Sequence, residues 1–218
     1  MWLEVKLIHN QMKNIEEIEY AGMKYYKGII DGTNIVLSTC GIGKVNAAIF
    51  TQIMIDKFEV NMIIHTGIAG SMDDNIKHGS LVIADGLTYY DVRKEQLMGA
   101  YPHQIIFPTD RKISDILLKT AGENALKGLI ITGDDFISDS EKKRKLKERF
   151  PEAICVEMEG CSVANAAFVN KIPVVVIRCI SDLADDASVN DYKEFEETAA
   201  NRASKVVLNA IKLIKKLV

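Results

Sequence analysis

The sequence has few of the features that mark secreted, membrane-spanning or multidomain proteins. Proline and cysteine occur four times each among 218 residues, and no Pro/Gly/Ser-rich linker, repeat or low-complexity tract divides the chain. Apolar runs fall well short of the roughly 18 residues that a membrane span requires. Residues 1–10 mix charged and apolar side chains, unlike a signal peptide. We therefore expect one soluble domain over residues 1–218, a cytoplasmic location and no membrane partner.

Cysteine spacing and charge exclude two further classes of function. The cysteines lie in or beside apolar segments and lack C-x-x-C spacing, so we expect reduced core residues and no metal site. They are Cys40, Cys155, Cys161 and Cys179. The net charge is −3, and the basic residues of 141–149 alternate with glutamate without interleaved aromatics. This pattern is typical of a solvated helix face, so we expect no nucleic-acid partner.

Hydrophobic periodicity alternates between helical and strand patterns along the chain. Helices are predicted from Trp2 to Met12 and over 44–58, 110–124, 140–150, 159–169 and 191–217. Strands are predicted over 18–30, 35–40, 61–65, 80–84, 128–132, 153–156 and 172–180. Asp31-Gly32 marks a hairpin between the first two strands. Strands that alternate with helices predict a three-layer α/β/α domain with a mixed, largely parallel central sheet.

Two of the predicted strands end in charged residues, where α/β folds assemble ligand sites. Segments 153–156 and 172–180 are rich in β-branched residues, which is typical of strands buried on both faces. The charged residues at their ends are Glu157, Glu159, Arg178 and Asp182. Unpaired charge in such a place is costly. The residues therefore either form an ion pair between strand ends or bind a ligand, and spacing alone leaves both alternatives open.

Two glycine-rich segments lack the spacing of the common nucleotide-binding motifs. In the segment CGIGKV at 40–45, Ser38 stands where the first glycine of a P-loop belongs, and Val45 replaces its Ser or Thr. The segment GIAG at 67–70 lacks G-x-G-x-x-G spacing. We reject ATP and NAD as ligands and expect no cofactor. Both segments are interpreted as tight turns, where the backbone either approaches a ligand or simply links a strand to a helix.

Six segments together resemble a known family. They are VEMEG at 156–160, RCISDLADD at 178–186, CGIGKV at 40–45, HTGIAG at 65–70, Tyr90-Asp91, and GLIITGDDFI at 128–137. This set resembles the nucleoside phosphorylase/nucleosidase superfamily, most closely the bacterial 5′-methylthioadenosine/S-adenosylhomocysteine nucleosidases. The resemblance covers nearly the whole chain and implies the same α/β architecture. It also implies hydrolysis of the N-glycosidic bond of both nucleosides, with release of adenine, in methionine salvage and the recycling of S-adenosylmethionine by-products.

The resemblance implies two catalytic carboxyl groups, as in inverting glycosidases. Asp182 would protonate adenine at N7, with Ser181 orienting it and Arg178 tuning the charge. Glu4 matches the base that activates water, because segment 1–5 aligns with the end of a first strand of pattern I-G-I-I-G-A-M. That strand does not precede Glu4 here. We expect either that the start of translation was assigned too late or that this variant works without the strand. A solvent-facing helix residue is the alternative for Glu4.

The resemblance also implies the residues that bind the substrate. Glu159 would accept hydrogen bonds from the ribose hydroxyls, and Met158 would pack under the ribose. Phe136 would stack on the purine, while the backbone of Ile137 would read the adenine edge. The other predicted substrate-binding residues are Ile68, Glu157, Arg178, Ser181 and Tyr192, the last at an apolar 5′ pocket. Asp134 and Asp135 are interpreted as turn formers.

The resemblance implies a homodimer in which the loop around Tyr101-Pro102 reaches the 5′ pocket of the neighbouring subunit. A surface turn is the alternative for that loop. A purine or uridine phosphorylase is the main alternative function, but phosphate requires cationic and hydroxyl donors. In phosphorylases an arginine and a serine occupy the positions of His65 and Ile68, so the sequence favours hydrolysis. A truncated, inactive nucleoside-binding homologue is a third possibility.

Overall fold

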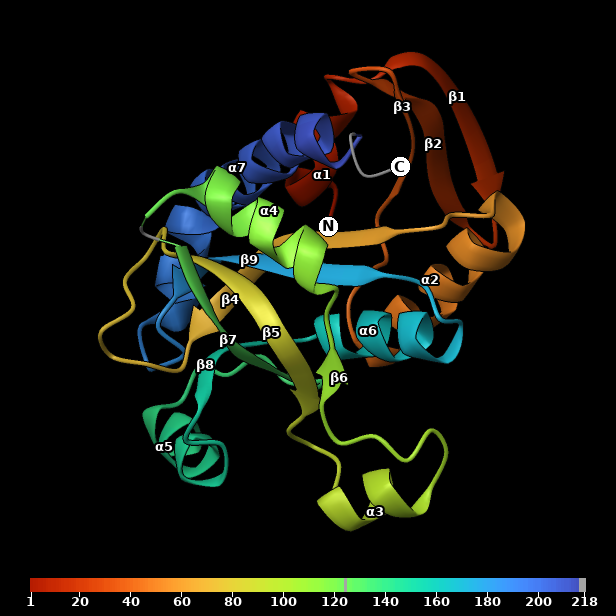
Figure 1. Ribbon diagram of the computed structural model, residues 1–218. Coiled ribbons are helices and arrows are strands. Elements are labelled where there is room, and N and C mark those ends of the chain that lie inside the picture. The colour runs from red at the N-terminus through yellow and green to blue at the C-terminus, as the bar shows by residue number, and fades with distance from the viewer. Residues whose placement is uncertain (124, 216–218) are drawn as a thin grey trace.

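The computed structural model describes residues 1–123 and 125–215, and helices alternate with strands along most of this length (Figure 1). The helices are α1 (Trp2–His9), α2 (Lys44–Phe58), α3 (Lys94–Gly99), α4 (Arg111–Ala121), α5 (Ser140–Arg149), α6 (Gly160–Val169) and α7 (Ser188–Ile214). The strands are β1 (Lys13–Tyr20), β2 (Met23–Ile30), β3 (Thr33–Ser38), β4 (Ile63–Ser71), β5 (Leu81–Tyr89), β6 (Phe107–Pro108), β7 (Ala125–Thr132), β8 (Ala153–Glu157) and β9 (Val174–Asp182).

The central sheet confirms the predicted fold class. Its strand order is β6-β5-β7-β8-β4-β9, and β5 also pairs with β9, so the sheet curls back on itself. The pairs β5–β7, β7–β8 and β4–β9 are parallel, whereas β5–β6, β4–β8 and β5–β9 are antiparallel. The pairs β5–β7 and β4–β9 are the longest. Helices α1, α4 and α7 cover one face and α2 and α6 the other, which gives three layers (Figure 1).

Strand β9 is covered on both faces of the sheet, which explains its nearly continuous run of apolar residues. All nine of its residues are buried. Val175 and Ile177 pack into the cluster formed with α1, α4 and α7, while Val174 and Val176 pack into the cluster formed with α2 and α6. Because successive side chains point to opposite faces, a strand covered on both sides needs apolar residues at nearly every position. The same burial surrounds the charged residues at its carboxyl end.

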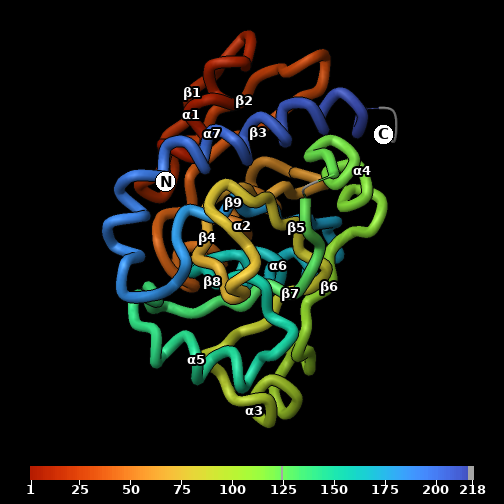
Figure 2. The backbone as a smooth tube through the Cα atoms, turned by 90° about the vertical axis from the view of Figure 1, so that its left-hand side faces the viewer, coloured from red at the N-terminus to blue at the C-terminus, as the bar shows by residue number. Residues whose placement is uncertain are grey.

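The N-terminal third adds a helix and a separate antiparallel sheet, β1-β2-β3. The predicted hairpin at Asp31-Gly32 is confirmed: both residues have positive φ and link β2 to β3. The single predicted strand 18–30 is wrong, because Ala21 and Gly22, also at positive φ, turn the chain between β1 and β2. Helix α1 packs beside α7 (Figures 1 and 2).

Other boundaries differ from the sequence prediction for local reasons. Helix α4 ends at Ala121 because Gly122 adopts a φ of 86°, and position 124 of the predicted helix lies outside the described residues. Helix α7 begins at Ser188, three residues earlier than predicted, and its predicted end at 217 also lies outside them. The short elements α3 and β6 were not predicted. Within the described residues, each helix is too short or too polar to span a membrane.

Candidate functional site

The carboxyl end of β9 lies against the ends of β4 and β8. Gly70 on β4 pairs with Asp182 on β9 and with Val156 on β8. The segment GIAG was interpreted as a turn, but residues 67–70 continue β4, so that interpretation is wrong. A Cβ at Gly67 would lie 2.5 Å from Glu4 Oε1, and one at Gly70 would lie 2.7 Å from Asp182 Oδ1. The glycines therefore make room for two charged side chains.

Glu157 and Arg178 form a buried ion pair. Arg178 Nη2 donates to Glu157 Oε2 over 2.5 Å, and both side chains are 2% exposed. The same carboxylate accepts the Thr132 hydroxyl and the backbone N–H groups of Glu159 and Gly160. The ion-pair alternative is thus realised for these two residues. Glu157 fixes the turn that presents Glu159, and its direct contact with substrate remains a prediction.

The surroundings of the Asp182 carboxyl group combine burial with hydrogen bonds from neighbouring residues. Asp182 is 2% exposed. Ser181 Oγ donates to its Oδ2 over 2.9 Å, and the Ala184 N–H donates to its Oδ1 over 3.0 Å. Burial raises the pKa of Asp182, although the hydrogen bonds from Ser181, Ala184 and Ser188 oppose the rise. This combination suits a general acid.

Glu159 lies at the start of α6 and faces the β3–α2 loop. The backbone N–H of Gly43 donates to Glu159 Oε1 over 2.8 Å. Burial, reinforced by the neighbouring Glu157 carboxylate, raises the pKa of Glu159 to about 7. Gly43 is its one hydrogen-bond donor within the described residues, so the carboxylate keeps acceptor capacity for a ligand.

Glu4 reaches the same site from α1. Its Oε1 accepts the backbone N–H of Ile68 over 3.2 Å, and its other oxygen pairs with the amino group of Met1. The side chain is 15% exposed, so the solvent-facing alternative is wrong. Ser204 on α7 anchors the helix by donating to the backbone carbonyl of Glu4 over 2.6 Å. The side chain of Ile68 packs against the α1/α7 cluster, so its backbone is the part that contacts the site residue.

A small cavity is lined in part by Phe136 and Ile137, the residues predicted to hold the base. It is lined by Gly70, Asp135, Phe136, Ile137, Val156, Glu157, Met158 and Asp182. The Tyr192 ring meets the Phe136 ring edge to face, with 5.7 Å between centroids. The Tyr192 hydroxyl lies 3.3 Å from the sulfur of Met1. Tyr192, Phe136 and Met1 thus form a largely apolar wall beside the cavity, and the role of Tyr192 at the 5′ pocket stays a prediction.

A second cavity of about 450 Å³ lies next to this one. It is lined by Tyr90, Asp91, Asp134, Asp135, Lys142, Lys145, Leu146 and Arg149. Its walls are mostly charged and open, whereas the smaller cavity contains the buried acid. We therefore assign the chemistry to the smaller one.

Sequence reasoning missed several residues that organise the site. Thr132 and Gly43 contact the site carboxylates, and Lys44 joins Asp91 to Asp134. The segments that contain them were recognised as motifs, but spacing alone did not indicate which turn would dock on which carboxylate.

Comparisons with known proteins identify the family of the chain. The sequence pattern of the phosphorylase superfamily matches residues 1–212. A 5′-methylthioadenosine/S-adenosylhomocysteine nucleosidase of Colwellia psychrerythraea is 36% identical over 225 residues, covering 97% of this chain and 93% of the relative. The corresponding enzyme of Staphylococcus aureus is 35% identical over 211 residues, covering 94% of this chain and 92% of the relative.

Solved structures of related enzymes superpose on most of the chain. The Neisseria meningitidis nucleosidase bound to methylthio-immucillin-A superposes with a TM-score of 0.93 at 32% identity, covering 98% of this chain and 96% of that one. A futalosine hydrolase of Helicobacter pylori superposes with a TM-score of 0.91 at 29% identity, covering 98% and 94%. The chain belongs to the phosphorylase superfamily and, within it, to the 5′-methylthioadenosine/S-adenosylhomocysteine nucleosidases.

Proposed function

We propose that this protein hydrolyses the N-glycosidic bond of 5′-methylthioadenosine and S-adenosylhomocysteine, releasing adenine and the thioribose product. The placement of two carboxyl groups beside β4 carries the proposal. Glu4 Oε1 lies against Gly67, and Asp182 Oδ1 lies against Gly70 of the same strand. Inverting glycosidases likewise use two separated carboxyl groups, one as the acid and one as the base, with room for a water between them.

Asp182 is the proposed acid. Burial raises its pKa and so favours the protonated form, which gives its proton to adenine N7 as the C1′–N9 bond breaks. Adenine then leaves neutral, and the bonding electrons go with it. Phe136 and Ile137 line the same cavity and are placed to hold the base by stacking and by backbone contact.

Glu159 and Glu4 act on the sugar. The free acceptor capacity of Glu159 receives the ribose hydroxyls, and this interaction strengthens as positive charge develops on the sugar. Glu4 takes a proton from the water that adds to C1′, while Arg178 balances the carboxylates around it. Water supplies the hydroxyl at C1′ and gives its proton to Glu4. The pair is reset when Glu4 releases that proton to solvent and Asp182 takes one up.

The 5′ pocket and the assembly belong to the same proposal. Tyr192 and Phe136 wall the pocket, and the loop at Tyr101-Pro102 completes it from the neighbouring subunit of a homodimer. An exposed apolar set on and before α2 supports an interface: Ile42, Val45 and Ile49 are 60%, 68% and 48% exposed. We also propose that the protein acts in the cytoplasm, in keeping with its four free cysteines.

The test is product analysis with 5′-methylthioadenosine in the presence and absence of phosphate. Hydrolysis predicts equal adenine release in both, with a free thioribose sugar as the second product. Release that requires phosphate, with a sugar phosphate as product, would identify a phosphorylase. Binding without release would identify an inactive nucleoside-binding protein.

Sedimentation of Val45→Glu tests the interface, since a dimer held by this face should shift to monomer.

A further inference from the structure

The GIGK segment, which the proposed reaction does not use directly, is held by a network of charges. Lys44 Nζ lies 2.5 Å from Asp91 Oδ2 and 3.5 Å from Asp134 Oδ2. The Lys44 backbone N–H donates to Asp134 Oδ1 over 2.7 Å, and the Asp134 N–H donates to Asp91 Oδ2 over 3.1 Å. One lysine thus joins three segments, which follow β3, β5 and β7.

The network fixes the conformation of Gly43. This residue has a φ of 90° and a ψ of 166°, which glycine adopts readily and other residues do not. A Cβ here would lie 3.0 Å from Asp134 Oδ1, so Asp134 packs directly against the glycine. As a result the adjacent N–H groups of Gly43 and Lys44 bind two different carboxylates, those of Glu159 and Asp134.

Partial burial makes these contacts stronger than those of an ordinary surface ion pair. The Lys44 and Asp91 side chains are 21% and 29% exposed. Lys44 Nζ also lies 5.6 Å from the centre of the Tyr89 ring, which favours a cation. The N–H groups at the positive end of the 15-residue helix α2 donate to Asp134 and Glu159. Asp134 was expected to be only a turn former, and here it also orients the loop of another strand.

We infer that Lys44, Asp91 and Asp134 are positioning residues for Glu159. They hold the Gly43 N–H against one part of that carboxylate, which leaves its remaining acceptor sites directed at the ribose hydroxyls. The inference rests on the proposed function, because it assigns Glu159 to the sugar. A misplacement of about 1 Å in such a group can lower a rate by on the order of 100-fold.

The experiment compares substrates with and without the hydroxyl that Glu159 binds. Lys44→Met and Asp91→Asn should each lower kcat/KM for 5′-methylthioadenosine by about 10- to 100-fold. The 2′-deoxy and 3′-deoxy analogues should lose much less, so the preference for the ribonucleoside shrinks. Lys44→Arg, which keeps the charge, should retain more of the preference for the ribonucleoside than Lys44→Met. When Lys44→Met or Asp91→Asn is added to Glu159→Gln, the further loss of rate should be smaller than the loss that the same substitution causes in the wild type.

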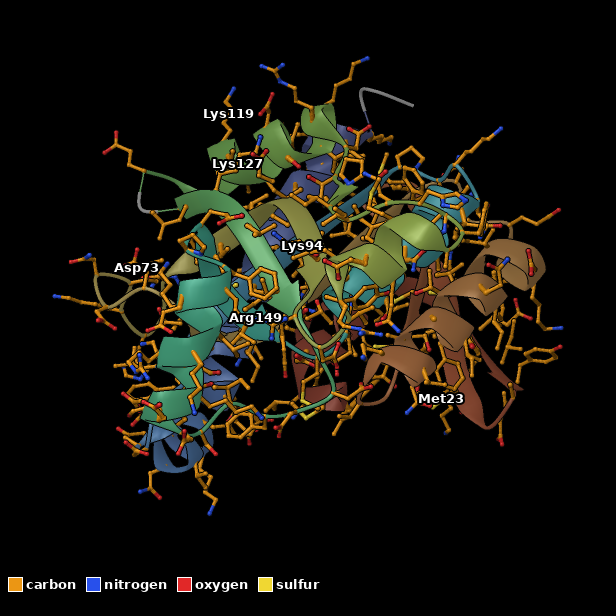
Figure 3. All side chains as sticks on the ribbon, turned by 90° about the horizontal axis from the view of Figure 1, so that it is seen from below. Met23, Asp73, Lys94, Lys119, Lys127 and Arg149 are labelled. Carbon is orange, nitrogen blue, oxygen red and sulfur yellow. The ribbon has the colours of Figure 1, made fainter. Side chains whose placement is uncertain are left out.

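Lys127→Met is the matched control. Lys127, labelled in Figure 3, pairs with Asp85 over 2.9 Å near the start of β7, whereas the network lies beyond the end of that strand. This variant should leave the ratio of ribonucleoside to deoxynucleoside activity unchanged. A purely structural network would lower the thermal unfolding temperature of Lys44→Met and Asp91→Asn without changing that ratio, and this outcome would overturn the inference.

Two further measurements keep the test decisive. If Lys44→Met does not fold, Asp134→Asn provides a milder change, because the Asp134 side chain is half exposed. If the wild-type protein releases no adenine, the proposed function fails, and the network is then tested by calorimetry. In that case the Kd of 2′-deoxyadenosine divided by the Kd of adenosine should fall in the variants, and an unchanged ratio would refute the positioning role.

Discussion

The two halves of the proposed site, the half around the proposed acid Asp182 and the half proposed to bind the sugar, are constructed in different ways. Asp182, in the acid half, is held by its own neighbours in the chain, Ser181 and Ala184. Each of the two carboxylates proposed for the sugar half accepts an N–H from a distant backbone group: Glu159 from Gly43, 116 residues away, and Glu4 from Ile68, 64 residues away. Glu4 also pairs with the nearby amino group of Met1. The acid is therefore set by one strand end, whereas the sugar half depends on how a loop and a helix dock.

Replacing the acid should have the largest effect. Asp182→Asn should lower adenine release by about 10²–10⁴-fold, because the amide can accept or donate a hydrogen bond at N7 but cannot readily give up a proton. Nucleoside binding should persist. Steady-state kinetics and calorimetry on the same preparation measure both effects. Asp186→Asn, an exposed residue four positions later, is the control. Turnover near that of the wild type in Asp182→Asn would remove this residue from the mechanism.

A smaller loss is expected in the sugar half. Glu159→Gln keeps the shape and loses the charge, so it should lower kcat by about 10- to 100-fold while weakening substrate binding much less. The reason is that the carboxylate interacts most strongly with the developing sugar cation. Kinetics with 5′-methylthioadenosine measure the split between kcat and KM. A variant that changes KM alone would show that Glu159 binds the ground state and transition state equally.

The same contrast explains what the sequence could predict. Asp182 and Ser181 adjoin in the chain at the end of an apolar run, so a strand pattern places them together. The contact of Gly43 with Glu159 depends on the docking of the β3–α2 loop, which periodicity does not specify. The turn at Ala21-Gly22 was missed because Ala-Gly is a weak hairpin signal. The extension of β4 through Gly70 was missed because glycine normally weakens a strand.

Disturbing the docking of α1 should affect the sugar half and spare the acid half. Ser204 is buried and donates to the Glu4 carbonyl over 2.6 Å. Ser204→Ala removes about 1 kcal/mol of hydrogen bonding and should lower kcat by a few fold through the position of Glu4. The control is Thr120→Ala, which removes a comparable 2.7 Å bond within α4. Equal activities of the two variants would show that the position of Glu4 does not depend on this anchor.

The last expected effect concerns stability and not activity: a pH dependence of stability that belongs mainly to Glu159. The folded protein without ligand holds this proton up to about pH 7, whereas the unfolded chain releases it near its ordinary pKa of 4.5. Between these values the folded state binds more protons, so the free energy of unfolding should fall as pH rises, by at most about 1.4 kcal/mol per pH unit.

Glu159→Gln should flatten this part of the profile, and the gain in stability over the wild type should be largest above pH 7. Asp182→Asn should change the same profile less, because its hydrogen bonds from Ser181 and Ala184 oppose the effect of burial. Denaturant unfolding at intervals from pH 4.5 to 7.5 measures all three proteins. Parallel profiles for the wild type and Glu159→Gln would mean that Glu159 is ionised throughout. The contact with the Gly43 N–H would then outweigh burial and the Glu157 charge, and the sugar half would be as firmly set as the acid half.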